Sequence, residues 1–292
     1  MKKTVIIGLM IAVILGGATL TCNAATTTTA TTVSTVQWDS ESALKRVNTI
    51  GQKLMKANNL PDTITFKVSN DDNVNAYANL NKEVYVYKGL LEYVTDDNEL
   101  AAVISHELGH IINGHCAKQT VLNSLIGTAS SSFNPQTELG TAALGLTQNL
   151  ASSKVSRNDE FEADLTGTDL LVRAGYNPLA MISVLNKICG NYFDVLSSHP
   201  SGERRLMNIY DYVEYNYNSY TKTGYKSDSY KKATSIINAN IAARNNNAKK
   251  LAKFQKEQAK LKAKKQKREI KMVKSGSNPW ETSLGMMQMF AQ

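Results

Sequence analysis

One stretch decides how this chain must fold: Ser105-His106-Glu107-Leu108-Gly109-His110. On a helix, His106 and His110 lie one turn apart on one face, with Glu107 beside them. Two imidazoles share one tetrahedral zinc ion only when they project from the same side, which leaves room for a third ligand and a water molecule. Because so short a match also arises by chance, the rest of the sequence must supply a helix and the missing ligand.

The residues around the motif predict that helix. Asp96 and Glu99 have the spacing of a capping box, and an apolar stripe follows at helical spacing: Leu100, Val103, Ile104, Ile111 and Ile112. His115 lies nine residues beyond His106, on the opposite side of an ideal helix. We therefore interpret His115 as a structural residue and not as a metal ligand.

A second helical segment begins near Arg157 and offers the third ligand. Glu160 and Asp164 fall one turn apart, so Glu160 is the candidate ligand and Asp164 is placed to accept a hydrogen bond from a ligating imidazole. Alternatively, both lie on a solvated helix face, as most helical carboxylates do. The capped helix with its histidine pair favours the ligand interpretation. Glu162, only two residues from Glu160, should point elsewhere.

The N-terminus has the pattern of an export signal. Lys2 and Lys3 precede an apolar run from Thr4 to Leu20, and Cys22-Asn23-Ala24 resembles a cleavage site, so we expect residues 1–24 to be removed. The alternatives are an uncleaved membrane anchor and a lipidated Cys22. No later apolar run is long enough to span a bilayer. We expect a soluble protein outside the cytoplasm, periplasmic or associated with the cell envelope.

Export also affects the two cysteines that remain after cleavage. An oxidising compartment allows a disulfide between Cys116 and Cys189. The alternative is a pair of buried thiols.

The remaining patterns predict an α+β fold. A Thr-rich linker (residues 25–37) precedes a domain at residues 38–220. Asp39 caps a helix that ends near Asn58, and three short strands follow at Ile64–Val68, Val74–Leu80 and Glu83–Tyr87. We expect a mostly helical domain with a small antiparallel sheet, arranged as a meander, next to the motif helix.

The net charge of +8 is unevenly distributed. Lys222 to Lys274 carries 17 Lys and Arg against 3 acidic residues, a net +14, so the rest of the chain is net −6. The basic tail, residues 221–292, could contact an anionic membrane or cell-envelope polymer, and export argues against nucleic acid. The alternative is a solvated helical or disordered tail. Trp280 to Phe290 has helical apolar spacing but no assignable role.

Together these motifs resemble the zinc metallopeptidase family that includes HtpX, the CAAX prenyl proteases and BepA, as a soluble exported member of gluzincin type. The resemblance covers roughly Trp38 to Tyr210, and the matching pieces occur in family order: Asn98 to Val103 leading into His106 to His110, then Ser156 to Asp164, Ala174 to Pro178, and Ser198-His199-Pro200 with Arg205. Two features depart from the family pattern: its inner-membrane members carry transmembrane helices, and none is expected here beyond the signal; BepA-like proteins carry a helical-repeat extension, whereas this chain ends in a basic tail.

The resemblance implies roles for these positions. His106, His110 and Glu160 would bind one Zn²⁺ per chain, with Glu107 as the catalytic base and Asp164 as the partner of a ligand. Asn75-Ala76-Tyr77 is similar to the edge strand that holds an extended substrate in such peptidases.

The resemblance also places His199 and Arg205 near the reacting groups. His199 would steady the oxyanion or block the metal in a latent form. The alternative for His199 is a turn residue before Pro200.

These expectations describe an exported zinc-dependent endopeptidase that hydrolyses unfolded or damaged cell-envelope proteins. Zinc would activate water and Glu107 would take its proton. One alternative is a degenerate peptidase that captures or controls polypeptides without cutting them. Another is a protein that acts mainly by binding the envelope through its basic tail.

Overall fold

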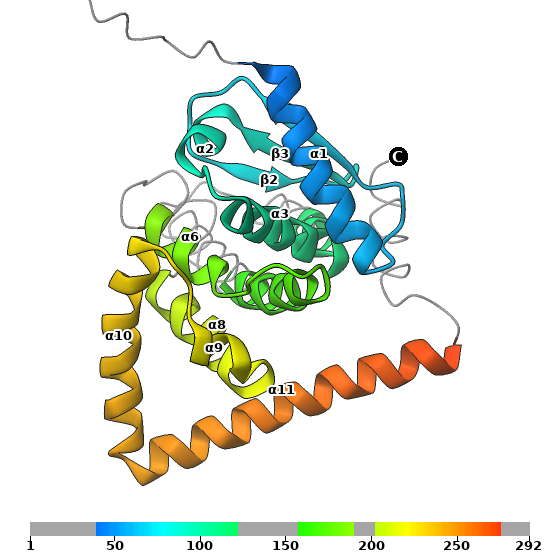
Figure 1. Ribbon diagram of the computed structural model, residues 1–292. Coiled ribbons are helices and arrows are strands. Elements are labelled where there is room, and N and C mark those ends of the chain that lie inside the picture. Colours follow the sequence, from blue (N-terminus) through cyan, green and yellow to red (C-terminus); the bar gives the residue numbers. More distant parts are fainter. Residues whose placement is uncertain (1–38, 122–156, 190–201, 276–292) are drawn as a thin grey trace, which may run out of the picture. The chain divides into compact units, whose positions relative to one another are not determined.

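The computed structural model describes residues 39–121, 157–189 and 202–275 (Figure 1). The first helix, α1 (Ser40–Ala57), begins as predicted, because the Asp39 carboxylate accepts hydrogen bonds from the backbone N–H groups of Glu41 and Ser42. Its apolar stripe is buried at Val47, Ile50 and Leu54, whereas Leu44 lies at the surface. The predicted export signal and linker lie outside the described residues.

The sheet contains β1 (Thr65–Ser69), β2 (Ala76–Ala78) and β3 (Glu83–Tyr87) in the order β1-β3-β2. β2 and β3 are antiparallel, but β1 runs parallel to β3, so the predicted antiparallel meander is wrong. The link between β1 and β2 is not a tight turn. This link contacts the start of α2 (Lys88–Tyr93), where Gly89 N–H donates to Asp71 O. β2 therefore lies at the edge of the sheet opposite β1, and β3 pairs between them. The α+β class is confirmed.

One face of the sheet forms part of the core. Phe66, Ala76, Val84 and Val86 alternate with more exposed residues, and α1 and the motif helix α3 (Asp97–Ile112) cover this face (Figure 1). Because β3 is central, β2 has one edge without a strand partner among the described residues.

Helix α3 is capped by Asp96, whose carboxylate accepts hydrogen bonds from the N–H groups of Asn98 and Glu99. The other half of the predicted capping box does not form, because the Glu99 carboxylate is buried and points away. It accepts a 2.6 Å hydrogen bond from Ser183 Oγ and lies 3.2 Å from Lys187 Nζ. Glu99 therefore connects α3 to α6 (Ala180–Cys189).

Four more helices follow in the described part: α8 (Gly202–Asn216), α9 (Asn218–Thr223), α10 (Asp228–Asn245) and α11 (Ala248–Ser275). α10 packs against α6 and buries Tyr230, Ala233 and Ile237. The packed core therefore continues beyond Tyr220, where the sequence suggested that the domain ends. Trp280 to Phe290 lies outside the described residues.

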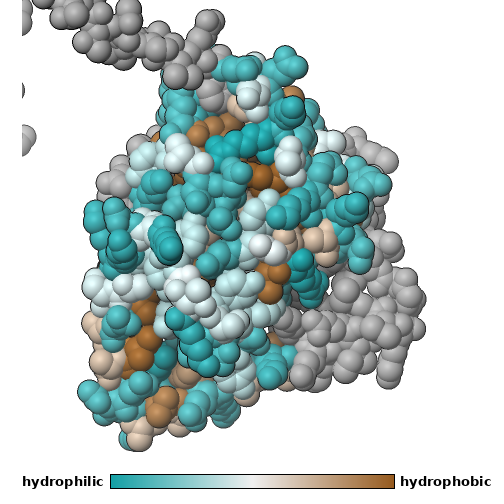
Figure 2. All heavy atoms as spheres, in the orientation of Figure 1, coloured by the Kyte–Doolittle hydropathy of each residue, from teal (hydrophilic) through white to brown (hydrophobic). Residues whose placement is uncertain are grey.

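The surface is mainly polar on the face seen in Figure 2, where hydrophobic residues form small separate patches. Within the described ranges, no helix is both long enough and apolar enough to cross a membrane.

Candidate active site

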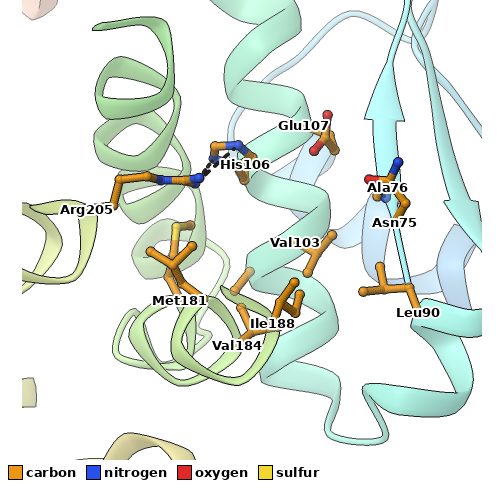
Figure 3. Close-up of a pocket in the computed structure, with 12 residues that line it drawn as sticks. Asn75, Ala76, Leu90, Val103, His106, Glu107, Met181, Val184, Ile188 and Arg205 are labelled. Carbon is orange, nitrogen blue, oxygen red and sulfur yellow. Dashed lines mark hydrogen bonds between the residues drawn. The ribbon is translucent and has the colours of Figure 1, made fainter. Parts of the chain in front are cut away.

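Helix α3 places the motif beside an apolar pocket. His106 and Glu107 lie at one end of this pocket, with Asn75 and Ala76 of the sheet edge beside them (Figure 3). The pocket encloses about 480 Å³ with its open mouth included, and its remaining walls are mainly apolar: Leu90, Ala102, Val103, Met181, Val184, Leu185 and Ile188, with Arg205. Tyr77 does not line the pocket, because its ring stacks on Tyr85 with centroids 4.9 Å apart.

The second motif lies on helical residues 157–173, which pass very close to α3. At Gly109, a Cβ atom would lie 2.7 Å from the backbone oxygen of Ala163, so only glycine permits this approach. Gly109 lies between the two histidines, and Ala163 lies between Glu160 and Asp164. The small residue inside the H-E-x-x-H motif therefore allows the two halves of the site to meet.

We expect Gly109→Ala to destabilise the protein by about 1–3 kcal/mol, the typical cost of overpacking a close contact. The added methyl group meets backbone and not a flexible side chain, so the helices must separate. The free energy of unfolding from urea titration measures this cost. An unchanged free energy of unfolding would show that the two helices accommodate the methyl group without cost.

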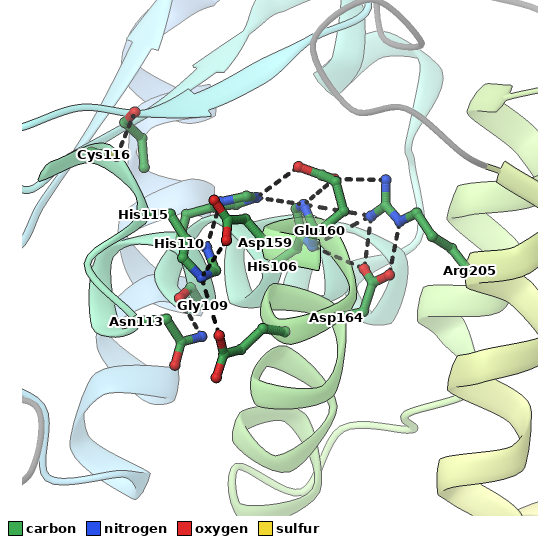
Figure 4. Close-up of polar contacts among 12 residues, drawn as sticks. His106, Gly109, His110, Asn113, His115, Cys116, Asp159, Glu160, Asp164 and Arg205 are labelled. Carbon is green, nitrogen blue, oxygen red and sulfur yellow. Dashed lines mark hydrogen bonds and ion pairs between the residues drawn. The ribbon is translucent and has the colours of Figure 1, made fainter. Parts of the chain in front are cut away.

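Three side chains converge between the helices (Figure 4). His106 Nε2 and His110 Nε2 lie 3.1 Å apart, and the Glu160 oxygens lie 3.3 Å and 3.2 Å from them. Ligands about 2.0–2.1 Å from a tetrahedral zinc ion are separated by about 3.3–3.4 Å. Two nitrogens and a carboxylate with this spacing fit zinc, so the group His106, His110 and Glu160 could hold the metal.

Asp164 and Arg205 support this group from behind. Asp164 Oδ1 lies 3.0 Å from His106 Nδ1, the nitrogen that faces away from the group. Arg205 donates to both Asp164 oxygens, from Nε at 2.8 Å and Nη2 at 2.7 Å, and its Nη1 lies 2.8 Å from Glu160 Oε2. Arg205 thus clamps Asp164 bidentately and neutralises part of the buried negative charge.

The carboxylates create a strongly cation-binding environment. Burial opposes charging of His106, but the hydrogen bonds that its ring donates to the Asp164 and Glu160 carboxylates outweigh burial and raise the pKa of His106 to about 9. Burial lowers the pKa of His110. Burial would also raise the pKa of Asp164, but the adjacent Arg205 guanidinium holds it below its usual range. The position between Glu160 and Asp164 therefore stabilises positive charge.

Sequence reasoning placed His115 incorrectly. α3 ends at Ile112, and Gly114 adopts φ +70°, so helical residues 115–121 do not continue the phase of α3. The His115 ring consequently contacts His110 instead of pointing to the opposite side. The sequence signal that could have revealed this break is the pair Asn113-Gly114, because helices commonly end at such a glycine. Glu162 lies away from the ligand group, as expected, near His115. His199 lies outside the described residues.

Cys116 is a free thiol in the structure, and its Sγ lies 3.5 Å from the backbone oxygen of Ala78. The side chain of Cys189 lies outside the described residues, so the disulfide remains a prediction.

Burial raises the pKa of the Cys116 thiol to about 12. Thiolate is the reactive form, so we expect iodoacetamide at pH 8 to label Cys116 very slowly in the folded protein and rapidly after unfolding. Peptide mass spectrometry of both samples measures this. Rapid labelling in the folded protein would contradict the burial, and failure to label after unfolding without reductant would indicate a disulfide.

A buried and a half-buried histidine on one helix, a buried glutamate on the next and a motif glutamate at the pocket define a zinc metallopeptidase. The chain belongs to peptidase family M48, whose model matches residues 41–213.

The individual relatives that the chain matches are also named as proteases. The chain is 34% identical to metalloprotease LoiP of Escherichia coli K12, over 57% of this chain and 69% of that protein. It is 31% identical to metalloprotease YcaL of the same organism, over 55% of this chain and 68% of that protein. It is 29% identical to the beta-barrel assembly-enhancing protease of Yersinia pestis, over 55% of this chain but only 37% of that longer protein. The chain thus spans about two thirds of the two metalloproteases and little more than a third of the longer relative.

Proposed function

We propose that the chain is an exported zinc endopeptidase that cleaves unfolded or damaged polypeptides of the cell envelope. The observation that carries this proposal is the position of the β2 edge, which adjoins the same pocket as His106 and Glu107. The export signal in the sequence and the name of the beta-barrel assembly-enhancing relatives support an envelope location.

The β2 edge favours an extended substrate. Asn75 O and Asn79 N are hydrogen bonded to β3, so the alternating backbone groups of Ala76 and Ala78 face the other edge. A peptide added there as a further strand would run past Glu107. Folded proteins rarely offer a free extended segment, and unfolded proteins do.

The apolar pocket suggests which side chain is held beside the scissile bond. Val103, Val184 and Ile188 would contact an apolar residue of the substrate and exclude water. Such residues are exposed mainly in unfolded chains. The pocket therefore selects for the same substrate state as the strand edge.

The chain's residues have separate tasks in the proposed reaction. Zinc, held by His106, His110 and Glu160, would supply a Lewis acid that acidifies water and polarises the scissile carbonyl. Glu107 takes the proton from the attacking water and passes it to the leaving amine. Asp164 fixes the orientation of His106, and Arg205 holds Asp164 in place.

The test uses the full chain, metal analysis and a permanently unfolded protein substrate. We expect about one zinc per chain and digestion that stops with chelator, returns with added zinc, and cuts beside large apolar residues. Zinc without digestion would favour the non-cleaving alternative. A chain that binds no zinc would overturn the proposal.

For the tail, we propose contact with an anionic membrane surface. In its first four turns α11 exposes six lysines: Lys249, Lys250, Lys253, Lys256, Lys260 and Lys262. Arg244, at the end of α10, fastens this region, because it pairs with Asp211 of α8 at 2.6 Å and its guanidinium lies 3.7 Å from the Phe254 ring centroid. These contacts fix the start of α11, so its exposed lysines form a positively charged surface of defined position.

Vesicle sedimentation tests this contact. We expect the full chain to sediment with vesicles that contain phosphatidylglycerol at low salt, and a variant with all six lysines changed to glutamine to remain in solution. Neutral phosphatidylcholine vesicles are the control. Equal sedimentation of both proteins would refute the contact.

A further inference from the structure

His115 occupies a position that the H-E-x-x-H motif does not explain. Its ring is 5% exposed, and its Nδ1 lies 3.0 Å from His110 Nδ1 (Figure 4). The ring planes meet at 75° with centroids 5.0 Å apart, so the two rings are close to perpendicular and are not stacked. Such a short distance between two nitrogens requires a hydrogen bond, with one ring as donor and the other as acceptor.

The neighbours determine the direction of this hydrogen bond. His110 Nε2 faces His106 and Glu160, so in the metal-binding form of His110 the proton must be on Nδ1. His110 Nδ1–H then donates, His115 Nδ1 accepts, and the proton of neutral His115 is on Nε2.

The surroundings of His115 Nε2 favour that tautomer. Glu162 Oε2 lies 3.6 Å away and Asp159 Oδ1 lies 3.8 Å away, and both stabilise a proton on this nitrogen. Asp159 is itself held by Lys118 Nζ at 2.5 Å. Nε2 has no hydrogen-bond acceptor within bonding distance in the described part of the chain, so these carboxylates act through their charge.

We propose that His115 is a positioning residue, which fixes the ring orientation and tautomer of His110 for zinc. This inference rests on the ligand set of the proposed function. The two histidine ligands then have equivalent support: Asp164 contacts Nδ1 of His106, and His115 contacts Nδ1 of His110. A partner of this kind typically changes metal affinity by about 10–100-fold.

The experiment measures zinc affinity by competition with a chromophoric chelator, independently of proteolysis. His115→Leu keeps an apolar side chain of similar size but has no acceptor. His115→Asn places an amide oxygen close to the position of Nδ1, whereas His115→Gln places its amide near Nε2. Thr120→Val is the control, because it removes a hydroxyl that donates to Cys116 O one turn further along.

We expect zinc to bind about 10–100-fold more weakly to His115→Leu and His115→Gln, with His115→Asn restoring most of the affinity. Thr120→Val should bind zinc as the wild type does. In the cobalt-substituted protein, the visible bands should shift in the leucine variant and return in the asparagine variant.

The outcomes are distinguishable. Wild-type zinc affinity in a folded His115→Leu variant overturns the positioning role but leaves the proposed function intact. If the leucine variant does not fold, equal zinc affinities of the asparagine and glutamine variants overturn the positioning role. A wild-type chain that binds no zinc overturns both.

Discussion

Replacing Glu107 with glutamine is expected to lower kcat/KM for an unfolded substrate by on the order of 10²–10⁴-fold, the usual contribution of a general base. Glutamine has nearly the same shape as glutamate but cannot take a proton from water. Glu107 lies beside His106 at the pocket and is not one of the three residues that could hold the metal. Zinc content should therefore be unchanged.

The control is another change from carboxylate to amide on the same helix. Asp97 lies in the first turn of α3, where its exposed side chain pairs with Arg46 at 2.8 Å. We expect Asp97→Asn to retain wild-type zinc content and kcat/KM, because surface ion pairs contribute little. Normal turnover by Glu107→Gln would refute the role of Glu107 as base.

The second large effect concerns stability. Arg205→Met should reduce the free energy of unfolding by about 3–5 kcal/mol in metal-free protein, because it leaves buried carboxylates without their countercharge. Asp164 loses both of its hydrogen bonds from the guanidinium, and Glu160 loses its ion pair. Urea titration followed by circular dichroism measures this loss.

Two comparisons isolate the cause. Arg205→Lys keeps the charge but cannot form the bidentate contact, so its stability should be intermediate. Arg244→Met removes the less buried pair with Asp211 and should cost less than Arg205→Met. Added zinc should recover part of the loss in Arg205→Met, since a bound cation stabilises the folded state. If Arg205→Met is as stable as the wild type, the guanidinium does not offset these charges.

The parts of the site that could be predicted from sequence are those set by local helical spacing. The interval from His106 to His110 and that from Glu160 to Asp164 each define one face of one helix, whatever the rest of the chain does. Their meeting depends on the close approach at Gly109, which no periodicity records. Arg205 could be named only from the resemblance, because its contacts with Asp164 span 41 positions of the sequence.

The errors share one physical origin, which is that tertiary contacts overrode a local rule. Glu99 has the spacing of a capping box, but its carboxylate accepts a buried hydrogen bond from Ser183 Oγ in place of one from a backbone N–H group at the surface. The strand order depended on the β1–β2 link, which is not a tight turn and is held against the start of α2 by the hydrogen bond from Gly89 N–H to Asp71 O. His115 was misplaced because the helix was assumed to continue past Gly114.

The shortness of β2 also has a consequence for self-association. An open strand edge is a template on which other chains can aggregate, and a long one would endanger a protein that meets unfolded chains. β2 has only three residues, and two local groups already contact its backbone: Asn75 Oδ1 accepts from Ala76 N–H, and Cys116 Sγ lies near Ala78 O. Such an edge offers few backbone hydrogen bonds, so a bound segment can leave after cleavage and does not nucleate a growing sheet.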